Sequence, residues 1–366
     1  MVYKEVLSKL GTNFKKIPFA IGSFWSVYRS REKAFFPPFR IQMENSTICN
    51  LNCQMCPLTE MKRKKGMMKF KDFKKIFDET RPSFLNLTGY GESFLNPDIF
   101  KMVAYAKKRD SFVKFDTNGT FLDEKKIAQT LKSGLDLISF SIDAALPTTY
   151  RKIRGSDELR KVIKNLKNLV EKRNETKNRL KIHIATVVQR DNLGEIIKLI
   201  KLADEIGVDS FNPTPVVEYD LSKNKKFKID SFLKKIRKII DDYQKLKDKL
   251  KIKVDIKPLE EVFESGRNHK KSCFIPWYSS YIAWNGDVFP CCYYYNGQIK
   301  FGNIFEKPFL EIWDSLAYQT FRKTLRDDRN RLPICKACSI DEQFLADKIK
   351  MARKVPILKN LSKRNF

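Results

Sequence analysis

Three cysteines near the start of the chain are the residues best suited to carry chemistry. Cys49, Cys53 and Cys56 are spaced C-x₃-C-x₂-C directly after an expected strand. Thiolate sulfur favours iron–sulfur clusters or zinc over hard cations. Three thiolates can hold three irons of a 4Fe-4S cubane and leave the fourth iron open, whereas tetrahedral zinc would need a fourth ligand that this loop does not contain. The spacing therefore favours a redox cluster with an open iron, and zinc held with a distant partner is the alternative.

A second group of cysteines lies far along the chain, and no cysteine separates the two groups. Its members are Cys273, Cys291, Cys292, Cys335 and Cys338. Within residues 281–290, an Asn285-Gly286 turn between strand-like residues predicts a β-hairpin. Four of these thiolates suffice to ligate one cubane completely, and a structural zinc site is the alternative. Two separate groups are typical of two metal sites rather than of a disulfide framework.

The composition limits the classes of protein but leaves the partner open. The chain has 366 residues and carries 72 Lys and Arg against 43 Asp and Glu, a formal net charge of +29. This excess favours anionic partners such as nucleic acid, acidic lipid or phosphorylated metabolites. Solvated lysines on helix faces, for example Lys234, Lys235 and Lys238, would explain it equally well. No stretch approaches the roughly eighteen apolar residues of a membrane span. Because thiolate clusters need a reducing compartment, we expect a cytoplasmic protein.

The N-terminal region contains an unusual apolar stretch. Residues 17–28 (IPFAIGSFWSVY) are mostly apolar or aromatic, with basic residues on both sides, and these twelve residues are too few to cross a bilayer. The stretch could lie in the interface of an anionic membrane, which would make the protein peripherally membrane-associated. Alternatively it packs on the main domain as a cap, which is the interpretation we favour.

From Phe39 to about Ser265, strand-like and helix-like stretches alternate. Six strand–helix units predict an α/β fold in which a parallel sheet forms a partial (β/α)₆ TIM-like barrel. We expect an N-terminal extension at 1–38, the barrel at 39–265, a small C-terminal iron–sulfur domain at 266–345 and a basic tail at 346–366. The expected strands are 39–44, 83–88, 112–116, 137–142, 180–188 and 208–212, and the expected helices are 70–80, 97–108, 123–132, 158–172, 193–206 and 231–249.

Short polar motifs follow three of these strands. They are Gly89-Tyr90-Gly91-Glu92, Thr117-Asn118-Gly119 and the stretch 139–143 (SFSID). Glycine lets the backbone approach a ligand closely, and Glu92 and Asp143 supply acceptors for an ammonium group or for ribose hydroxyls. Each motif alone is typical of a plain turn. Because the C-terminal strand ends of a barrel meet at one edge, the motifs and the cysteine loop together predict a single pocket.

These features resemble the radical S-adenosylmethionine (SAM) enzymes over about residues 39–217. The cysteine spacing and the G-x-G-E motif are the most specific elements, and the run Cys56-Pro57 through Arg63, Gly66 and Met68 is similar to one in many members. The resemblance implies a 4Fe-4S cluster that binds SAM at its open iron and, when reduced, cleaves it to a 5′-deoxyadenosyl radical that abstracts hydrogen from a substrate. The implied cluster ligands are Cys49, Cys53 and Cys56, and the implied SAM-binding residues are Met55 at adenine, Gly89, Gly91 and Glu92 at the amino group, Ser141 and Asp143 at ribose, and Asn118.

The second cysteine group resembles the C-terminal SPASM or twitch domains of the same enzymes. Gly286-x₄-Cys291 and the runs at 302–304 and 311–313 share in this resemblance. It implies an auxiliary 4Fe-4S cluster ligated by Cys273, Cys291, Cys335 and Cys338. No further cysteine follows in the sequence, so we expect one auxiliary cluster, as in the twitch subclass. Full ligation favours electron transfer, and therefore oxidation or dehydrogenation of the substrate.

The sequence does not decide the role of Cys292 or the identity of the substrate. Cys292 is an inert thiol, an alternate ligand in place of Cys291, or a hydrogen-atom donor that would turn oxidation into epimerisation. The substrate is an anionic or conjugated small molecule, which we favour because no peptide-recognition domain precedes the barrel, or else a peptide or RNA. A low-potential electron donor such as a flavodoxin or ferredoxin is a further expected partner. The alternative of another class is a non-catalytic iron–sulfur or zinc protein that binds nucleic acid.

Overall fold

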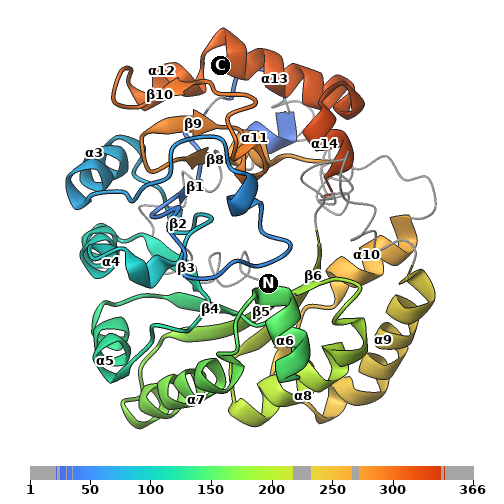
Figure 1. Ribbon diagram of the computed structural model, residues 1–366. Helices are drawn as coiled ribbons and strands as arrows, with labels where there is room; N and C mark the ends of the chain where they lie inside the picture. Colours follow the sequence, from blue (N-terminus) through green and yellow to red (C-terminus); the bar gives the residue numbers. More distant parts are fainter. Residues whose placement is uncertain are drawn as a thin grey trace, which may run out of the picture.

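The strands form one curved sheet with most of the helices outside it. The computed structural model describes residues 22, 25–29, 31–34, 36–216, 232–265, 272–338 and 342. Its ten described strands lie in the order β10-β9-β8-β1-β2-β3-β4-β5-β6-β7. From β1 to β7, neighbours in the sheet are also successive in the chain and pair in parallel. Figure 1 shows α3, α4, α5, α7, α8 and α9 along the outer side of this curve. The parallel α/β architecture predicted from the sequence is confirmed.

The elements of the barrel largely follow the expected ranges. The strands are β1 (Arg40–Met43), β2 (Phe84–Asn86), β3 (Phe112–Thr117), β4 (Leu137–Ser141), β5 (Lys181–Val188), β6 (Ser210–Pro215) and β7 (Lys253–Val254). The helices are α3 (Phe70–Thr80), α4 (Ile99–Lys107), α5 (Glu124–Lys132), α6 (Pro147–Arg154), α7 (Leu159–Glu175), α8 (Ile196–Ile206), α9 (Leu233–Leu246) and α10 (Lys257–Ser265). The sequence did not predict α6, β7 or α10.

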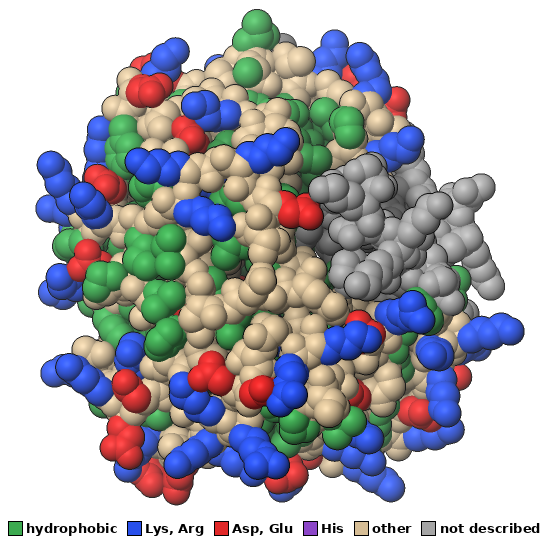
Figure 2. Space-filling view, in the orientation of Figure 1, with side chains coloured by type: hydrophobic (Ala, Val, Ile, Leu, Met, Phe, Trp, Pro, Cys, Tyr) green, Lys and Arg blue, Asp and Glu red, His purple; other side chains and the backbone are tan. Residues whose placement is uncertain are grey.

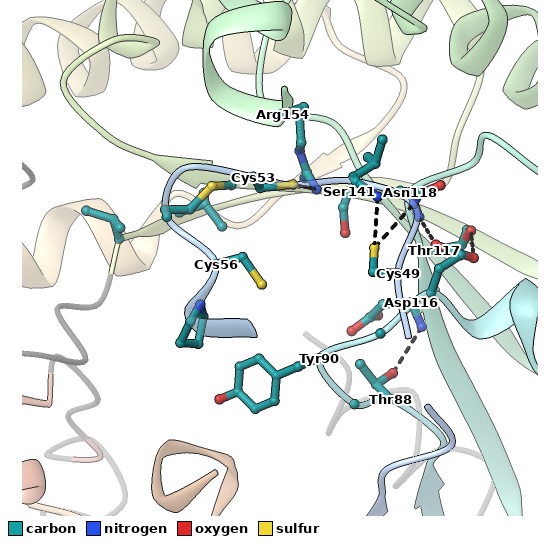
Figure 3. A pocket seen from close by; sticks show the side chains of 18 of the residues that line it. Cys49, Cys53, Cys56, Thr88, Tyr90, Asp116, Thr117, Asn118, Ser141 and Arg154 are labelled. Atoms are coloured by element: carbon teal, nitrogen blue, oxygen red, sulfur yellow. Dashed lines mark hydrogen bonds between the residues drawn. The ribbon is translucent and has the colours of Figure 1, made fainter. Parts of the chain in front are cut away.

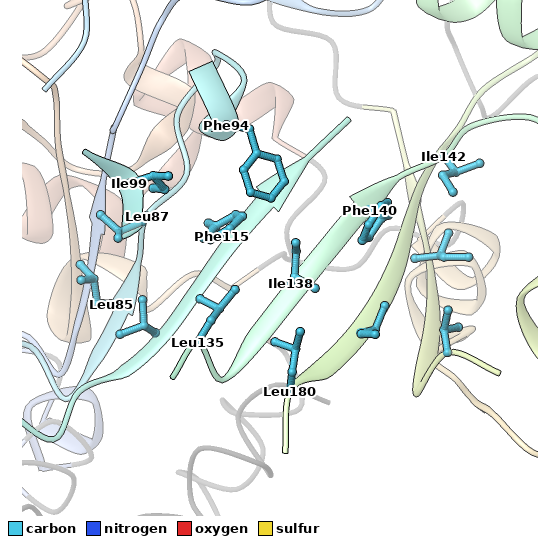
Figure 4. Close-up of a cluster of buried hydrophobic side chains, with 14 of the residues drawn as sticks. Leu85, Leu87, Phe94, Ile99, Phe115, Leu135, Ile138, Phe140, Ile142 and Leu180 are labelled. Atoms are coloured by element: carbon cyan, nitrogen blue, oxygen red, sulfur yellow. The ribbon is translucent and has the colours of Figure 1, made fainter. Parts of the chain in front are cut away.

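Alternation along the strands separates an apolar outer face from a polar inner face. Side chains at alternate strand positions point to opposite faces of a sheet. Phe115, Ile138 and Phe140 belong to the main hydrophobic core, and Figure 4 shows them beside Leu85 and other apolar side chains of neighbouring elements. After the apolar first residues Phe112 and Leu137, the intervening positions of β3 and β4 are polar, and their last members line the cavity described below. Because the apolar side chains pack on the outer face, the polar side chains that alternate with them lie on the inner face.

The C-terminal hairpin continues the same sheet. Strand β8 (Ser279–Ile282) pairs in parallel with β1, and β9 (Asp287–Phe289) pairs antiparallel with β8. The predicted turn is confirmed, with Gly286 at a φ of 85° that favours glycine. The parallel pairing with β1 was not expected. The remaining C-terminal elements are α11 (Ile275–Tyr278), β10 (Gly302–Asn303), α12 (Phe309–Trp313), α13 (Leu316–Asp327) and α14 (Pro333–Ala337).

Part of the apolar N-terminal stretch packs on this C-terminal region. Val27 and Tyr28 are 3% and 2% exposed and belong to a cluster with Trp277 and Phe321. For these residues the structure supports the cap. Residues 17–21, 23 and 24 lie outside the described part of the chain, as do most of the expected extension 1–38 and the whole tail 346–366. Among the helices that are described, none is long and apolar enough to span a membrane.

Basic side chains are spread over the surface. In the face shown in Figure 2, Lys and Arg are scattered, with Asp and Glu among them. On α9, Lys234, Lys235 and Lys238 are exposed, whereas Ile236 and Ile239 are buried. These lysines therefore occupy the solvated face of an amphipathic helix, as one of the two interpretations of the net charge expected.

Candidate active site

The C-terminal ends of the barrel strands surround a cavity of about 360 Å³. A cavity of this size is typical of small-molecule sites. It contains all three thiols of the first cysteine group, and Figure 3 shows them on one loop facing the strand ends. Its lining comprises Cys49, Leu51, Cys53, Met55, Cys56, Pro57, Thr88, Gly89, Tyr90, Gly91, Glu92, Asp116, Thr117, Asn118, Ser141, Arg154, Val187, Thr214, Pro215, Val216 and Tyr293. The predicted convergence of these motifs on one pocket is present in the structure.

The cysteine loop is short and tightly held. The amide of Cys56 donates to the carbonyl of Cys53 at 3.0 Å, and the amide of Gln54 donates to the carbonyl of Ile153 on α6 at 2.9 Å. Cys53 is buried, and Cys49 and Cys56 are half-buried. Burial raises the pKa of the Cys56 thiol to about 11. Binding iron would require this thiol to lose its proton, since thiolate is the ligating form.

The Gly89–Glu92 loop lies directly against the segment that leads into Cys49. The amides of Gly91 and Glu92 donate to the carbonyls of Ser46 and Ile48, each at 2.9 Å. A Cβ on Gly91 would lie 2.5 Å from the Ile48 carbonyl oxygen, so only glycine fits without a backbone shift. The motif is therefore more than a plain turn, because it fixes two cavity walls to each other.

Glu92 is a buried carboxylate that is already hydrogen-bonded by the protein. Its side chain accepts from the amides of Phe94 and Asn118 and from the hydroxyl of Thr117, at 3.0, 2.7 and 2.7 Å. Burial raises the pKa of Glu92, although these hydrogen bonds oppose the shift. The carboxylate is thus oriented at the cavity wall before any ligand arrives.

Met55, Asn118 and Ser141 lie at the cavity as the resemblance implied. The side-chain nitrogen Nδ2 of Asn118 donates to Asn50 Oδ1 at 2.9 Å and lies 4.0 Å from Cys49 Sγ. Ser141 ends β4, in line with the polar alternation of that strand. These three residues are placed around the thiols from three different elements.

Asp143 requires a correction. It is fully buried and is not part of the cavity lining. Its Oδ1 accepts from the amide of Val187 at 2.7 Å, and its Oδ2 lies 2.6 Å from Nε of Arg154. Because both oxygens are engaged within the protein and the side chain does not line the cavity, this structure does not place Asp143 at the expected ribose site.

Arg154 is a charged cavity residue that sequence reasoning missed. It ends α6, lines the cavity, and places Nη1 at 3.7 Å from Cys53 Sγ. Burial by itself lowers the pKa of Arg154, but Asp143 and Cys53 outweigh it and raise that pKa. Gly155 follows at a φ of 66°, where a Cβ would lie 2.9 Å from the Asn52 carbonyl oxygen. The Arg-Gly pair at a helix end was the available signal.

The second group of thiols gathers at the C-terminal region. Cys338 is 8% exposed, and Cys273, Cys291, Cys292 and Cys335 pack against one apolar cluster that includes Trp277 and Tyr294. Burial raises the pKa of Cys291, and the neighbouring Cys292, Cys338, Cys273 and Cys335 raise it further. Arg329 donates to the carbonyls of Cys335 and Cys338 at 2.6 and 2.9 Å.

Cys292 does not line the cavity. Its half-buried thiol packs in the apolar cluster, and burial raises its pKa to about 11. The thiol considered above as a hydrogen-atom donor is therefore not part of the cavity lining in this structure. The next residue, Tyr293, lines the cavity instead.

Both groups suit iron–sulfur clusters by the chemistry of their donors. Each offers thiols that are buried or half-buried, and soft thiolate is the ligand type that iron–sulfur clusters take. Within the residues that the structure describes, no three Cys, His, Asp or Glu side chains are close enough to share a single metal ion. The fit therefore rests on the type and grouping of the thiols.

Comparison with known proteins agrees with these features. Residues 43–203 match the Radical SAM superfamily, and residues 273–339 match SPASM, an iron–sulfur cluster-binding domain. The chain is 26% identical over 321 residues to the tungsten-containing aldehyde ferredoxin oxidoreductase cofactor-modifying protein of Pyrococcus furiosus, covering 82% of this chain and 87% of that protein. It is 27% identical over 328 residues to the AdoMet-dependent heme synthase of Methanosarcina barkeri, covering 82% and 88%.

A solved structure shares the fold. The structure of Streptococcus suis SuiB bound to the precursor peptide SuiA superposes with a TM-score of 0.64 at 21% identity, covering 82% of this chain and 71% of that chain. At this identity the likeness concerns the arrangement of the elements.

Proposed function

Because the chain belongs to the radical SAM superfamily and carries a SPASM iron–sulfur domain, we propose that it oxidises a small-molecule substrate by hydrogen abstraction. The observation that supports this most is the single cavity shared by Cys49, Cys53, Cys56 and the Gly89–Glu92 loop. The cofactors of the chain are a 4Fe-4S cluster with SAM at the barrel and further iron–sulfur at the SPASM domain. When bound and reduced, the cluster at the barrel would supply the electron that cleaves SAM to a 5′-deoxyadenosyl radical, which would take a hydrogen atom from the substrate.

Residues of this chain would hold these groups at the cavity. We assign the three cavity thiols as cluster ligands, and Glu92 as the acceptor for the SAM amino group. Asn118 and Ser141 would bind polar groups of SAM, and Met55 would pack against adenine as a flexible apolar side chain. Arg154 would stabilise the Cys53 thiolate, since its guanidinium lies 3.7 Å from that sulfur.

The same residues would exclude water and fix charge before reaction. Glu92 is held by three donors and Arg154 by Asp143, so neither has to reorient when a ligand enters. Preorganised groups of this kind avoid a reorganisation cost in the reactive complex. The half-buried thiols and the walls of Leu51, Pro57 and Val216 would keep solvent from a reactive intermediate.

Oxidation is favoured over epimerisation by the place of Cys292. An epimerising thiol would have to reach the substrate, whereas Cys292 lies outside the cavity lining. The four other cysteines of the second group, Cys273, Cys291, Cys335 and Cys338, would hold one auxiliary 4Fe-4S cluster, which would supply an acceptor for the electron lost when a substrate radical is oxidised. Tyr293 brings the backbone beside Cys291 to the cavity, which supports a short path between the two sites.

The relatives and the basic surface bear on the class of substrate. The two relatives named above are described as modifying the cofactor of an oxidoreductase and as synthesising heme, and both are covered over most of their length. We therefore favour a conjugated or anionic small molecule, for which the basic surface would raise the local concentration. A peptide substrate is the second candidate, because SuiB shares the fold and was solved with a precursor peptide.

The central test is the cleavage of SAM. The full chain is reconstituted anaerobically with iron and sulfide, reduced with dithionite and incubated with SAM, and 5′-deoxyadenosine is quantified. We expect product from the parent chain and none from Cys53→Ala, while Cys292→Ala retains it. No product from the parent chain would refute the proposed catalyst and leave a non-catalytic metal protein, and equal product from the parent chain and Cys53→Ala would refute the assigned role of Cys53. A low-potential flavodoxin or ferredoxin replacing dithionite would identify the class of electron donor.

A further inference from the structure

One side chain of the cavity wall also contacts the auxiliary cysteine loop. Tyr90 stands between Gly89 and Gly91, and its hydroxyl donates to the carbonyl of Cys292 at 2.8 Å. Its ring packs on that of Tyr295, with ring centroids 4.9 Å apart. Figure 3 shows this ring extending from the loop that follows Thr88, on the side of the cavity nearest Cys56. Tyr90 therefore connects the SAM cavity to backbone next to Cys291.

The loop that Tyr90 contacts reaches both sites. Residues 292–294 form the single 3₁₀ turn η8 (Cys292–Tyr294), and the amide of Tyr294 donates to the carbonyl of Cys291 at 3.2 Å. Tyr293 lines the cavity, while the hydroxyl of Tyr294 lies 3.3 Å from Cys335 Sγ. Because such a turn moves as a unit, a shift at the Cys292 carbonyl would reach two assigned auxiliary ligands.

The other end of the connection is fixed to the first cysteine loop. Gly91 and Glu92 are hydrogen-bonded to Ser46 and Ile48, immediately before Cys49. The backbone on the C-terminal side of Tyr90 can therefore move only with the segment that leads into this cysteine. A continuous series of contacts joins the two thiol groups, and packed and hydrogen-bonded contacts of this kind can carry coupling between sites.

We propose that Tyr90 is a positioning residue through which occupancy of the SAM cavity changes the environment of the auxiliary cluster. The proposal rests on the proposed function, because it takes both thiol groups to be cluster sites. Coupling between two sites is reciprocal. Reduction of the auxiliary cluster would therefore change the affinity of the cavity for its ligand by the same factor.

Reductive titration of the reconstituted full chain tests the coupling. S-adenosylhomocysteine serves as the cavity probe, because its thioether is not cleaved as the sulfonium of SAM is. Electron paramagnetic resonance follows the midpoint potential and spectrum of the auxiliary cluster, whose signal is identified by its loss in Cys335→Ser. We expect the probe to shift this signal in the parent chain. Tyr90→Phe, which keeps the ring packing, should lose at least half of the shift, and Tyr90→Leu should lose all of it.

A matched variant controls for removal of a tyrosine hydroxyl. Tyr243 on α9 also donates to a backbone carbonyl, that of Val254 at 3.5 Å, and lies outside both thiol sites. Tyr243→Phe should retain the full shift. An unshifted signal in the parent chain, or the same shift in both Tyr90 variants as in the parent, would overturn the coupling. If the parent binds no iron or forms no 5′-deoxyadenosine from SAM, the proposed function falls as well, so the two failures are distinguishable.

Discussion

Replacing Arg154 with methionine would leave a buried carboxylate without its cation. The side chains of Arg154 and Asp143 are 9% and 0% exposed, and Nε lies 2.6 Å from Oδ2. Removing one partner of a buried ion pair costs about 3–5 kcal/mol, mostly through the unpaired charge that stays behind. We therefore expect the free energy of unfolding to fall by about 3–5 kcal/mol in Arg154→Met. Loss of the contact with Cys53 Sγ should also weaken iron retention.

Anaerobic urea unfolding of the iron-loaded chain measures the first effect, and iron content after gel filtration measures the second. Lys152→Met is the matched control, because Lys152 lies on the same helix and pairs with Asp191 at 2.6 Å but is 61% exposed. An exposed pair is worth about 0–1 kcal/mol. The double variant Arg154→Met/Asp143→Asn removes the charge and keeps an acceptor for Val187, so it should recover at least half of the stability lost in the single variant.

Two results would refute this reasoning. One is an equal loss of stability in Arg154→Met and Lys152→Met, which would mean that burial of the pair has no energetic weight. The other is a double variant no more stable than the single one, which would mean that the unpaired carboxylate is not the cause. Iron content that is unchanged in Arg154→Met would separately exclude the expected role at Cys53.

Three further predictions follow from single contacts. Burial lowers the pKa of His183 from 6.5 to about 4, so its contribution to stability is complete above pH 6.5 and is lost as the pH falls toward 4. At about 1.36 kcal/mol per pH unit, the free energy of unfolding of the parent should fall over that range by about 3 kcal/mol more than that of His183→Asn. Urea unfolding measures this difference. Gly91→Ala should lower the free energy of unfolding by about 1–3 kcal/mol and weaken the binding of S-adenosylhomocysteine, which calorimetry measures. Gly194→Ala should change neither quantity, because no atom lies within 4 Å of the new Cβ. Tyr281→Phe removes a 2.6 Å hydrogen bond to the buried Glu44 carboxylate and should cost about 1.5–3 kcal/mol; unchanged unfolding would contradict a role for this bond.

The sequence predicted those parts of the molecule that carry local signals. Helix α3 occupies the predicted residues 70–80, because Phe73, Ile76 and Phe77 recur at helical spacing and are buried. The cavity was predictable for a different reason, since parallel strands place all their C-terminal ends at one edge. Glu92 and Ser141 therefore come together even though neither motif alone specified a site.

What the sequence did not reveal depends on contacts between distant residues. The resemblance implied that Asp143 contacts ribose, but α6 was not recognised, and in the structure the Asp143 carboxylate pairs with Arg154 of that helix and does not line the cavity. A short helix that begins at Pro147 and ends at Arg154, just before Gly155, offers little periodicity to detect. The pairing of β8 with β1 joins residues more than two hundred positions apart and has no local pattern at all.

This pairing has a consequence for the relation between the two thiol sites. Without β8, the β1 edge would lose its neighbour on one side and present unpaired backbone groups. Buried polar contacts also cross this pairing. Glu44, directly after β1, accepts a hydrogen bond from the hydroxyl of Tyr281 on β8 and forms an ion pair with Arg63. Arg63 also donates to the carbonyl of Tyr295. Because these groups are satisfied only when both regions are folded together, removing either region would leave a buried charge short of partners. We therefore expect the barrel and the C-terminal hairpin to unfold as one cooperative unit, because they share one sheet and one buried polar network that lies between the two thiol groups.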